Sequence, residues 1–196
     1  MKKYSLLLLS FFLIQCSSGK MSELYQVYNS KDFLYWSENK KLTWDDFQGE
    51  PLDSSGLAGE IQIYNPSTIE KASLFSSAKL TSICVFDKKH SWINKKFASG
   101  DILLYNQTIF DIYEVYTRIL RRTFDSTVFS LTDYTQKFHQ MTEKNNSELK
   151  DRIEKFRKES NLGQNRKALI TWSFQIKKEL DSLKEYKFDS PGDNKR

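Results

Sequence analysis

The apolar side chains of residues 101–122 recur at the spacing of one helical face. Intervals of 3, 4, 3, 4 and 3 residues join Ile102, Tyr105, Ile109, Ile112, Tyr116 and Ile119. This period predicts an α-helix, and Ser99 or Asp101 can cap its start. Further apolar positions widen the stripe, namely Leu103, Phe110, Tyr113 and Leu120. Because so broad an apolar face must be covered, we expect the helix to lie inside a domain.

Short apolar runs with the composition of β-strands precede this helix. We expect strands at residues 33–36, 42–44, 57–64 and 80–86, and a further strand is left open at residues 70–77. Residues 45–51 are polar and contain a glycine and a proline, so they predict a turn. Residues 87–89 predict another turn, which would place His90 in a loop.

The chain after residue 122 is almost wholly helical in its pattern. Helical spacing joins Leu131, Tyr134, Phe138 and Met141, then Leu149, Ile153 and Phe156, and finally Leu169, Trp172, Ile176, Leu180 and Leu183. A stop signal separates the last two sets, at Asn161, Leu162 and Gly163. Strands followed by helices predict an α+β fold. We place it in a single domain at residues 24–188, followed by a polar, disordered tail at residues 189–196.

The start of the chain has the order of a targeting signal. Two lysines precede an apolar run at residues 6–14, which is too short to span a bilayer. The following residues resemble the lipobox of bacterial lipoproteins, in which Cys16 becomes the lipidated first residue, although Gln15 occupies a position where a small residue is usual. An ordinary signal peptide cut after Gly19 is the alternative. We therefore predict a signal peptide at residues 1–15 and a lipidated tether at residues 16–23. The protein would be anchored by lipid in the cell envelope, at the outer membrane.

Charge and cysteine content limit the kinds of partner and of chemistry that we expect for the mature chain. Removing residues 1–15 leaves 181 of the 196 residues, about one domain, and lowers the formal net charge from +5 to +3 because Lys2 and Lys3 are lost. No basic stripe with interleaved aromatic residues occurs, so we do not expect nucleic acid as a partner. Cys84 is the one cysteine besides Cys16, and its apolar neighbours predict a buried thiol rather than a nucleophile.

Four short motifs follow one another along the chain. They comprise Leu42, Trp44, Asp46, Phe47, Gly49 and Pro51; Phe86, Asp87, Ser91 and Trp92; Phe110, Asp111, Ile112, Glu114, Tyr116, Arg118, Leu120 and Arg121; and Glu159, Gly163 and Trp172. Their order and spacing resemble bacterial domain-of-unknown-function family 922, secreted proteins whose central helix carries an HExxH motif and which are predicted zinc-dependent proteases. The resemblance covers nearly all of the mature chain and implies a zincin-like domain.

The residues that would bind zinc in that family are absent here. The resemblance places Tyr105 and Ile109 at the two histidines, Asn106 at the general base, and Leu162 at a later histidine. None of these side chains is a ligand that Zn²⁺ prefers, and an amide cannot serve as the base. The chain has 2 histidines, His90 and His139, and they are not at the spacing that lets one helix hold a metal. We therefore expect neither a metal nor another cofactor.

The sequence accordingly favours a pseudoenzyme, a non-catalytic binding or structural module of the cell envelope. Its binding cleft would be lined by Tyr105, Asn106, Ile109, Glu114 and Leu162, and would accept a small apolar ligand or another envelope protein. For Glu114, an ion pair with Arg118 is the simpler explanation. One alternative is an active metal-dependent hydrolase with carboxylate ligands at Asp45, Asp46, Asp111 and Glu114. Another is a structural envelope protein with no ligand.

Overall fold

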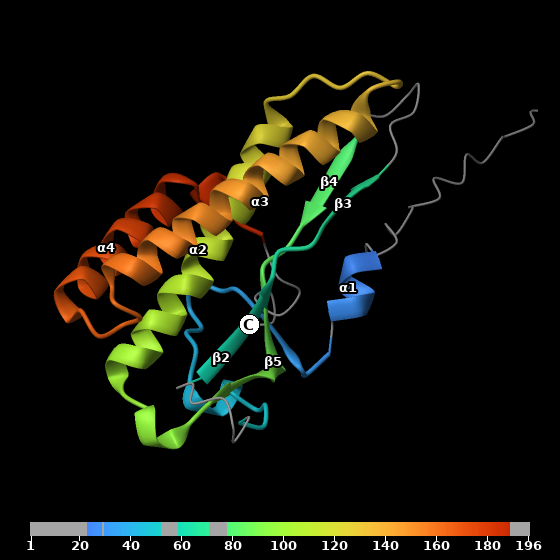
Figure 1. Cartoon of the computed structure of the whole chain (residues 1–196). Coiled ribbons are helices and arrows are strands. Elements are labelled where there is room, and N and C mark those ends of the chain that lie inside the picture. The colour runs from blue at the N-terminus through green and yellow to red at the C-terminus, as the bar shows by residue number, and fades with distance from the viewer. Residues whose placement is uncertain (1–22, 29, 52–58, 71–77, 189–196) are drawn as a thin grey trace, which may run out of the picture.

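The computed structural model of the chain describes residues 23–28, 30–51, 59–70 and 78–188 (Figure 1). The predicted signal peptide, Cys16 and the predicted tail at residues 189–196 lie outside the described residues. No helix within the described ranges is both long enough and apolar enough to cross a membrane.

Short strands come first and long helices follow. The strands are β1 (Phe33–Tyr35), β2 (Gly59–Tyr64), β3 (Ser67–Glu70), β4 (Lys79–Ser82) and β5 (Val85–Ile93). The helices are α1 (Glu23–Tyr28), α2 (Gly100–Asp125), α3 (Tyr134–Glu159) and α4 (Arg166–Ser182), with short 3-10 turns η1 (Trp44–Asp46), η2 (Lys95–Phe97) and η3 (Lys184–Tyr186). This order confirms the predicted α+β class.

The strands form two small antiparallel sheets. In the larger sheet β5 lies between β1 and β2, and the smaller sheet pairs β3 with β4. Phe86 of β5 is opposite Leu34 on one side and Ile63 on the other, and its side chain is fully buried. The centre of the larger sheet therefore contributes directly to the hydrophobic core.

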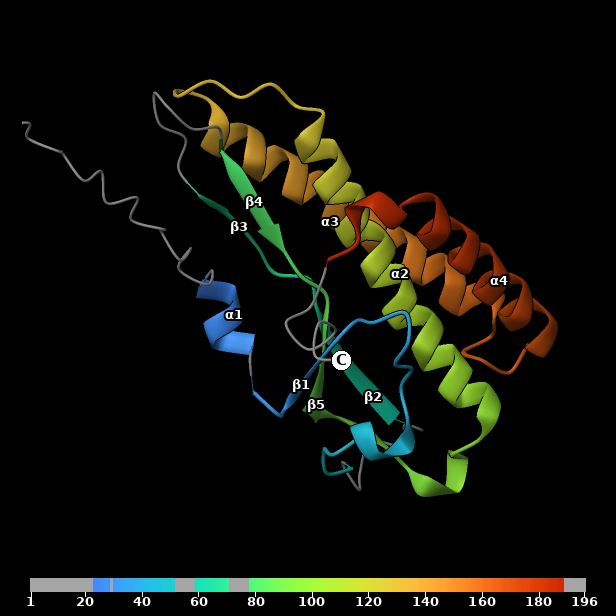
Figure 2. The same ribbon diagram turned by 180° about the vertical axis from the view of Figure 1, so that it is seen from behind.

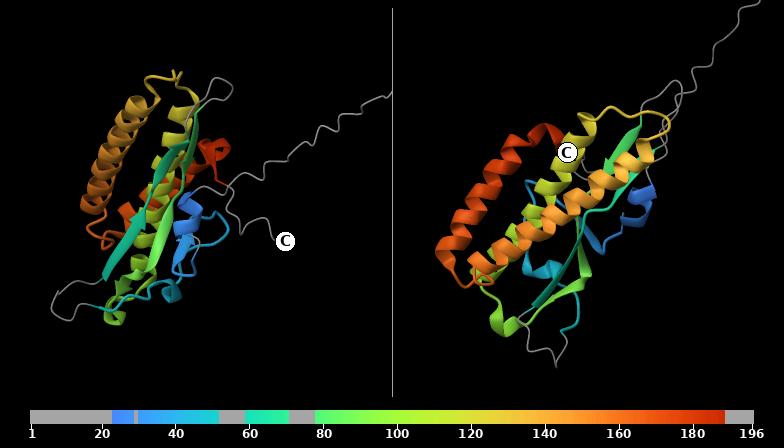
Figure 3. Two further views of the ribbon diagram at one scale, coloured as in Figure 1. Left: turned by 90° about the vertical axis from the view of Figure 1, so that its right-hand side faces the viewer. Right: turned by 45° about the horizontal axis from the view of Figure 1, so that its top comes forward.

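Helix α2 connects the two halves of the molecule. It packs against α3 and α4 and also against strands of both sheets, and Figure 3 shows the two later helices flanking it. Its start is capped by the Ser99 hydroxyl, which accepts from the Ile102 amide. Farther along, the hydroxyls of Thr108 and Thr117 donate to the carbonyls four residues earlier. These internal bonds satisfy polar groups that burial removes from water.

The apolar stripe of α2 lies in the core as predicted. Ile109 is 2% exposed, and Ile112 is completely buried. Tyr105 stacks on Phe156 of α3 with ring centroids 5.2 Å apart, and Phe156 meets Trp172 of α4 edge-on at 5.4 Å. Each fully buried side chain of this size stabilises the fold by about 1.5–3 kcal/mol, so this stripe accounts for much of the attachment of α2 to the later helices.

Several local predictions before α2 are wrong. Residues 42–44 form no strand, because the Thr43 amide and hydroxyl both donate to Asp46 Oδ2 at 2.9 Å and close η1 instead. Residues 80–86 belong to two strands in different sheets, because the pairing breaks between Ser82 and Val85. The Ile83 amide there donates to the Pro66 carbonyl. β5 then continues through the predicted turn at residues 87–89, and its register against β2 shifts between Asp87 and Trp92.

Two smaller features also differ from the prediction, and a third agrees with it. α1 was not predicted, and it begins at Glu23, inside the predicted tether. β3 covers Ser67–Glu70, earlier than the strand left open at residues 70–77, of which only residue 70 is described. The stop after α3 is confirmed, since Asn161, Leu162 and Gly163 all have positive φ angles.

Candidate functional site

A cavity of about 480 Å³ opens between α2, α4 and the segment that follows β1. One face of α2 contributes Gly100, Leu103, Leu104, Gln107, Asp111 and Arg118. Residues on the facing elements are Trp36, Leu42, Leu180, Lys177, Lys184 and Lys187. Figure 2 shows the segment after β1 running beside α2 on its way to η1. The cavity has the size typical of small-molecule sites.

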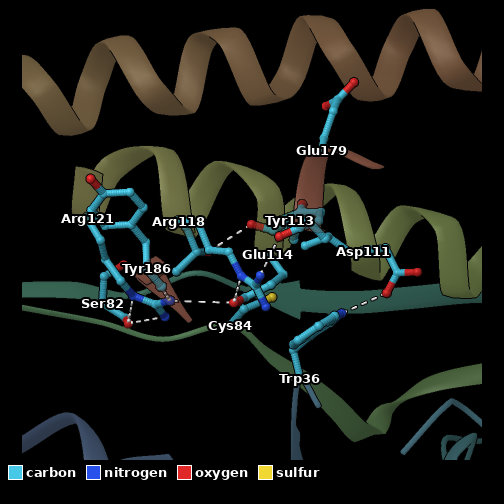
Figure 4. Close-up of polar contacts among 12 residues, drawn as sticks. Trp36, Ser82, Cys84, Asp111, Tyr113, Glu114, Arg118, Arg121, Glu179 and Tyr186 are labelled. Atoms are coloured by element: carbon cyan, nitrogen blue, oxygen red, sulfur yellow. Dashed lines mark hydrogen bonds and ion pairs between the residues drawn. The ribbon is translucent and has the colours of Figure 1, made fainter. Parts of the chain in front are cut away.

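A polar cluster fixes the segment after β1 against α2 at this cavity. Asp111 Oδ1 accepts from Trp36 Nε1 at 2.7 Å (Figure 4). It also accepts from Gln107 Nε2 at 2.7 Å. Gln107 Oε1 in turn accepts from the Leu42 amide at 2.8 Å. Burial raises the pKa of Asp111, while Lys41, 3.7 Å away, and the two donors act in the opposite direction. The carboxyl group therefore serves as the acceptor that orients the Trp36 ring.

Arg118 lies beside this cluster and is 2% exposed. Its Nε donates to Glu114 Oε1 at 2.8 Å, and its Nη1 donates to the Leu180 carbonyl of α4 at 2.8 Å. The guanidinium also lies over the Trp36 ring, 4.8 Å from the centroid. Its Nη2 has no hydrogen-bond partner among the residues that the structure describes. Arg118 thus joins three elements and keeps one donor unused.

Arg121 extends the buried charge network away from the cavity. Its Nη2 and Nε donate to the Ser82 carbonyl at 2.6 and 3.0 Å, and its Nη1 donates to the Tyr186 carbonyl at 2.6 Å. The same Nη1 is 3.5 Å from Glu114 Oε1. Figure 4 shows how the Arg121 guanidinium holds the end of β4 and η3 together. Glu114 is therefore a shared counter-ion of two arginines.

The exposed part of the cavity is mainly cationic. Lys177 and Lys184 are exposed, Lys187 is half-buried, and the Lys41 side chain is 52% exposed. Two carboxylates, Glu38 and Asp181, lie among them. By their exposure these groups form the rim, while the buried Trp36, Leu42, Arg118 and Leu180 form the floor.

The residues predicted for a cleft do not line this cavity. Tyr105 and Ile109 face the core of α3 and α4, and Asn106 is 6% exposed. Leu162 is 57% exposed, so its side chain points to solvent. Its neighbour Gly163 makes the approach instead: a Cβ added there would lie 3.0 Å from the Tyr105 Cβ. The structure therefore brings Tyr105 and Ile109 together but leaves Leu162 outside.

Glu114 forms an ion pair with Arg118, as the simpler explanation of this residue predicted. The other carboxylates of the hydrolase alternative lie in separate environments. Asp46 Oδ1 is 4.0 Å from Lys88 Nζ, Asp45 is exposed, and Asp111 is held by Trp36 and Gln107. Across the described ranges no three His, Cys, Asp or Glu side chains gather as a metal would require.

The remaining reactive side chains are placed as follows. Cys84 is buried, its thiol donates to the Phe110 carbonyl at 3.9 Å, and burial raises its pKa well above the usual value. His90 lies in β5 rather than in a loop, and its Nδ1 is 2.8 Å from Asp87 Oδ2 with the side chain 70% exposed. The Cys84 thiol, which is buried and protonated, is therefore a poor nucleophile.

The sequence analysis missed Trp36, Gln107 and Lys177 as site residues. A signal was nevertheless present in α2: the polar residues Gln107, Asp111, Glu114, Arg118 and Arg121 follow at intervals of 4, 3, 4 and 3. This is the same helical period as the apolar stripe, displaced around the axis. A polar stripe on a helix that must be buried predicts a buried network or a binding site.

Comparisons with protein-family models, with curated proteins and with solved structures give no match. The likeness to a protease-like family therefore rests on the sequence motifs alone.

Proposed function

We propose that this chain is a non-catalytic binding module of the bacterial cell envelope. Cys16 would carry the lipid that holds it at the membrane, and the cavity between α2 and α4 would receive a small ligand. The observation that carries the proposal is the polar stripe of α2. Asp111 and Gln107 hold the segment after β1, and Glu114 pairs with Arg118 and Arg121, which bind the Leu180 and Tyr186 carbonyls. These carboxylates and the amide therefore shape the cavity rather than supply a free base or nucleophile.

We further propose that the domain descends from a zincin-like fold whose metal site has been lost. Contacts between the motifs support this. The Gly49 amide donates to the Ser91 carbonyl at 2.8 Å, and a Cβ at Gly49 would lie 2.9 Å from the Lys89 carbonyl oxygen. The rings of Phe47, Phe86 and Phe110 also pack in sequence, with centroids 5.3 and 5.9 Å apart. Residues retained from three motifs thus have packing roles that do not depend on a metal.

Residues of the fourth motif also have a structural role that does not depend on a metal. Trp172 Nε1 donates to Glu159 Oε2 at 2.8 Å and so joins α4 to the end of α3. The histidine positions, in contrast, hold Tyr105 and Ile109, which fill the core. A scaffold whose packing residues persist while its ligands are replaced is what we expect of a protein that kept its fold after losing catalysis.

Blocking the cavity tests the binding role. Gly100 lines the cavity, and a Cβ added there meets nothing within 4 Å, so Gly100→Trp should fold and narrow the entrance. Ile170→Trp is the matched control, because Ile170 is 50% exposed and lies outside the lining. Nile red, a neutral apolar dye, should bind the wild type and the control alike. Its affinity for Gly100→Trp should fall at least tenfold in a fluorescence titration. Equal binding by all three proteins would contradict the proposal.

A further inference from the structure

The cavity contains one buried donor without an acceptor. Arg118 lines the cavity, and its Nη2 has no partner within the described part of the chain, although Nε and Nη1 both have one. Arginine cannot escape the cost of a lone buried donor by losing its proton. An acceptor from outside the described residues, such as a group of a bound ligand, would satisfy this donor.

The acidic group on the same floor has one oxygen fully engaged. Asp111 Oδ1 already accepts two hydrogen bonds at 2.7 Å and has Lys41 at 3.7 Å, and neither Asp111 oxygen is a buried atom without a partner. A cationic ligand at Oδ1 would compete with three existing partners, while an anionic ligand would complete Arg118. The hydrogen-bonding group left unused on the cavity floor is a donor, so it favours a ligand that supplies an acceptor.

The overall charge of the lining agrees with this choice. Its cations are Lys41, Arg118, Lys177, Lys184 and Lys187, and its carboxylates are Glu38, Asp111 and Asp181. The cations exceed the carboxylates by two, and most lie at the rim. A low-dielectric hollow edged by positive charge attracts anions from solution.

The walls between the charges are apolar. Trp36, Leu42, Leu103, Leu104 and Leu180 line the hollow. A small inorganic anion would leave this surface in contact with water. A ligand that uses the whole cavity must combine apolar volume with an acceptor at one end.

We propose that the cavity binds an amphipathic anion, an aliphatic chain that lies against the leucines and ends in a carboxylate or phosphate that accepts from Arg118 Nη2. This proposal rests on the proposed function, since it names the chemistry of the ligand for the same cavity. Carboxylate and phosphate share this recognition, because both present oxygens that suit a guanidinium fork.

A head-group series on the full chain tests the proposal without any mutation. Decanoate, decyl phosphate, decanol and decyltrimethylammonium, each below its micelle concentration, are titrated by isothermal calorimetry. At least one of the two anions should bind at least tenfold more tightly than decanol, and the cation should bind most weakly. The stronger anion tells a fatty-acid source from a phosphate-bearing one. If decanol binds as tightly as both anions, the proposed anion recognition is wrong while the cavity remains a binding site. If no ligand saturates, the proposed function fails as well.

Two variants place the head group at Arg118. Arg118→Met should weaken the preferred anion at least tenfold more than it weakens decanol. Lys177→Met, at the exposed rim, should weaken the anion only a few-fold, and Lys150→Met, away from this cavity, should have no effect. If Arg118→Met does not fold, as judged by its circular dichroism, the head-group series and Lys177→Met still decide the question. Unchanged anion binding in a folded Arg118→Met overturns the proposal.

Discussion

Two stripes run along α2 and are buried for different reasons. The apolar stripe, which includes Tyr105, Ile109 and Ile112, packs on α3, α4 and the larger sheet. The polar stripe, from Gln107 to Arg121, binds the segment after β1 and the carbonyls of Leu180, Ser82 and Tyr186. One stripe is held by many interchangeable dispersion contacts, and the other by a few directional hydrogen bonds between specific groups.

This difference separates stability from specificity in the fold. An apolar contact tolerates a change of partner as long as volume is kept. A buried arginine tolerates only its own acceptors, since an unpaired charge costs far more than the pair contributes. We infer that the apolar stripe holds α2 inside the domain, while the polar stripe fixes which segments lie next to it and so shapes the cavity.

The largest expected effect comes from breaking the ion pair. Glu114→Leu leaves the guanidinium groups of Arg118 and Arg121 without their shared carboxylate. We expect a loss of about 3–5 kcal/mol in the free energy of unfolding, measured by urea denaturation. The double variant Glu114→Leu/Arg118→Leu removes one of the stranded charges and should recover a large part of that loss.

Variants in the apolar stripe provide the comparison for these single and double variants of the polar stripe. Ile109→Ala should cost about 2–5 kcal/mol, and Ile109→Ala/Ile112→Ala should cost more than either single change. If the polar pair shows no recovery in its double variant, the two stripes do not differ in the way inferred here.

The second effect depends on pH and belongs to the polar stripe. Burial raises the pKa of Asp111 in the folded protein above that of the unfolded chain, so the folded state binds more protons. The contribution of Asp111 to stability is therefore fully present below the unfolded pKa and is lost as pH rises through the folded pKa. Asp111→Asn keeps an acceptor for Trp36 and cannot titrate. The stability of this variant relative to wild type should increase as the pH rises above about 4, the ordinary pKa of an aspartate, as measured by thermal unfolding at each pH. A difference that stays constant would contradict the raised pKa.

The smallest expected effect concerns Leu162, which the sequence placed in a cleft. Its φ angle is 54° and its side chain is 57% exposed. Asparagine adopts this left-handed region more readily than leucine. Leu162→Asn should therefore change the free energy of unfolding by no more than about 0.5 kcal/mol, in the stabilising direction. A loss above 2 kcal/mol in chemical denaturation would show that Leu162 does pack against the domain.

The sequence predicted the parts of the fold that one periodicity determines. α2 and the two later helices were found because their apolar residues repeat over many turns, and the stop at Gly163 was found because few residues adopt its φ of 89°. The break between β4 and β5 could not be found in this way. It depends on partners distant in the chain, the Pro66 carbonyl and the Arg121 side chain, which bind Ile83 and Ser82.

The candidate site was predicted less well than the fold. The family resemblance directed attention to the apolar stripe, where the ligands would have been, and away from the polar stripe next to it. Trp36 was beyond the reach of sequence analysis, because its contact with Asp111 joins residues 75 positions apart. Only tertiary structure shows that the two belong to one site.

The hydrogen bonds of the Arg121 guanidinium to Ser82 and Tyr186 have a consequence for folding during synthesis. They link Ser82, where the strands change sheets, to Tyr186, near the last described residue. During synthesis the strands emerge long before residue 186 exists, so this set of hydrogen bonds cannot be completed at that stage. Contacts this distant in sequence also slow folding. The joint contact of Arg121 with Ser82 and Tyr186 can therefore form only after residue 186 has been synthesised.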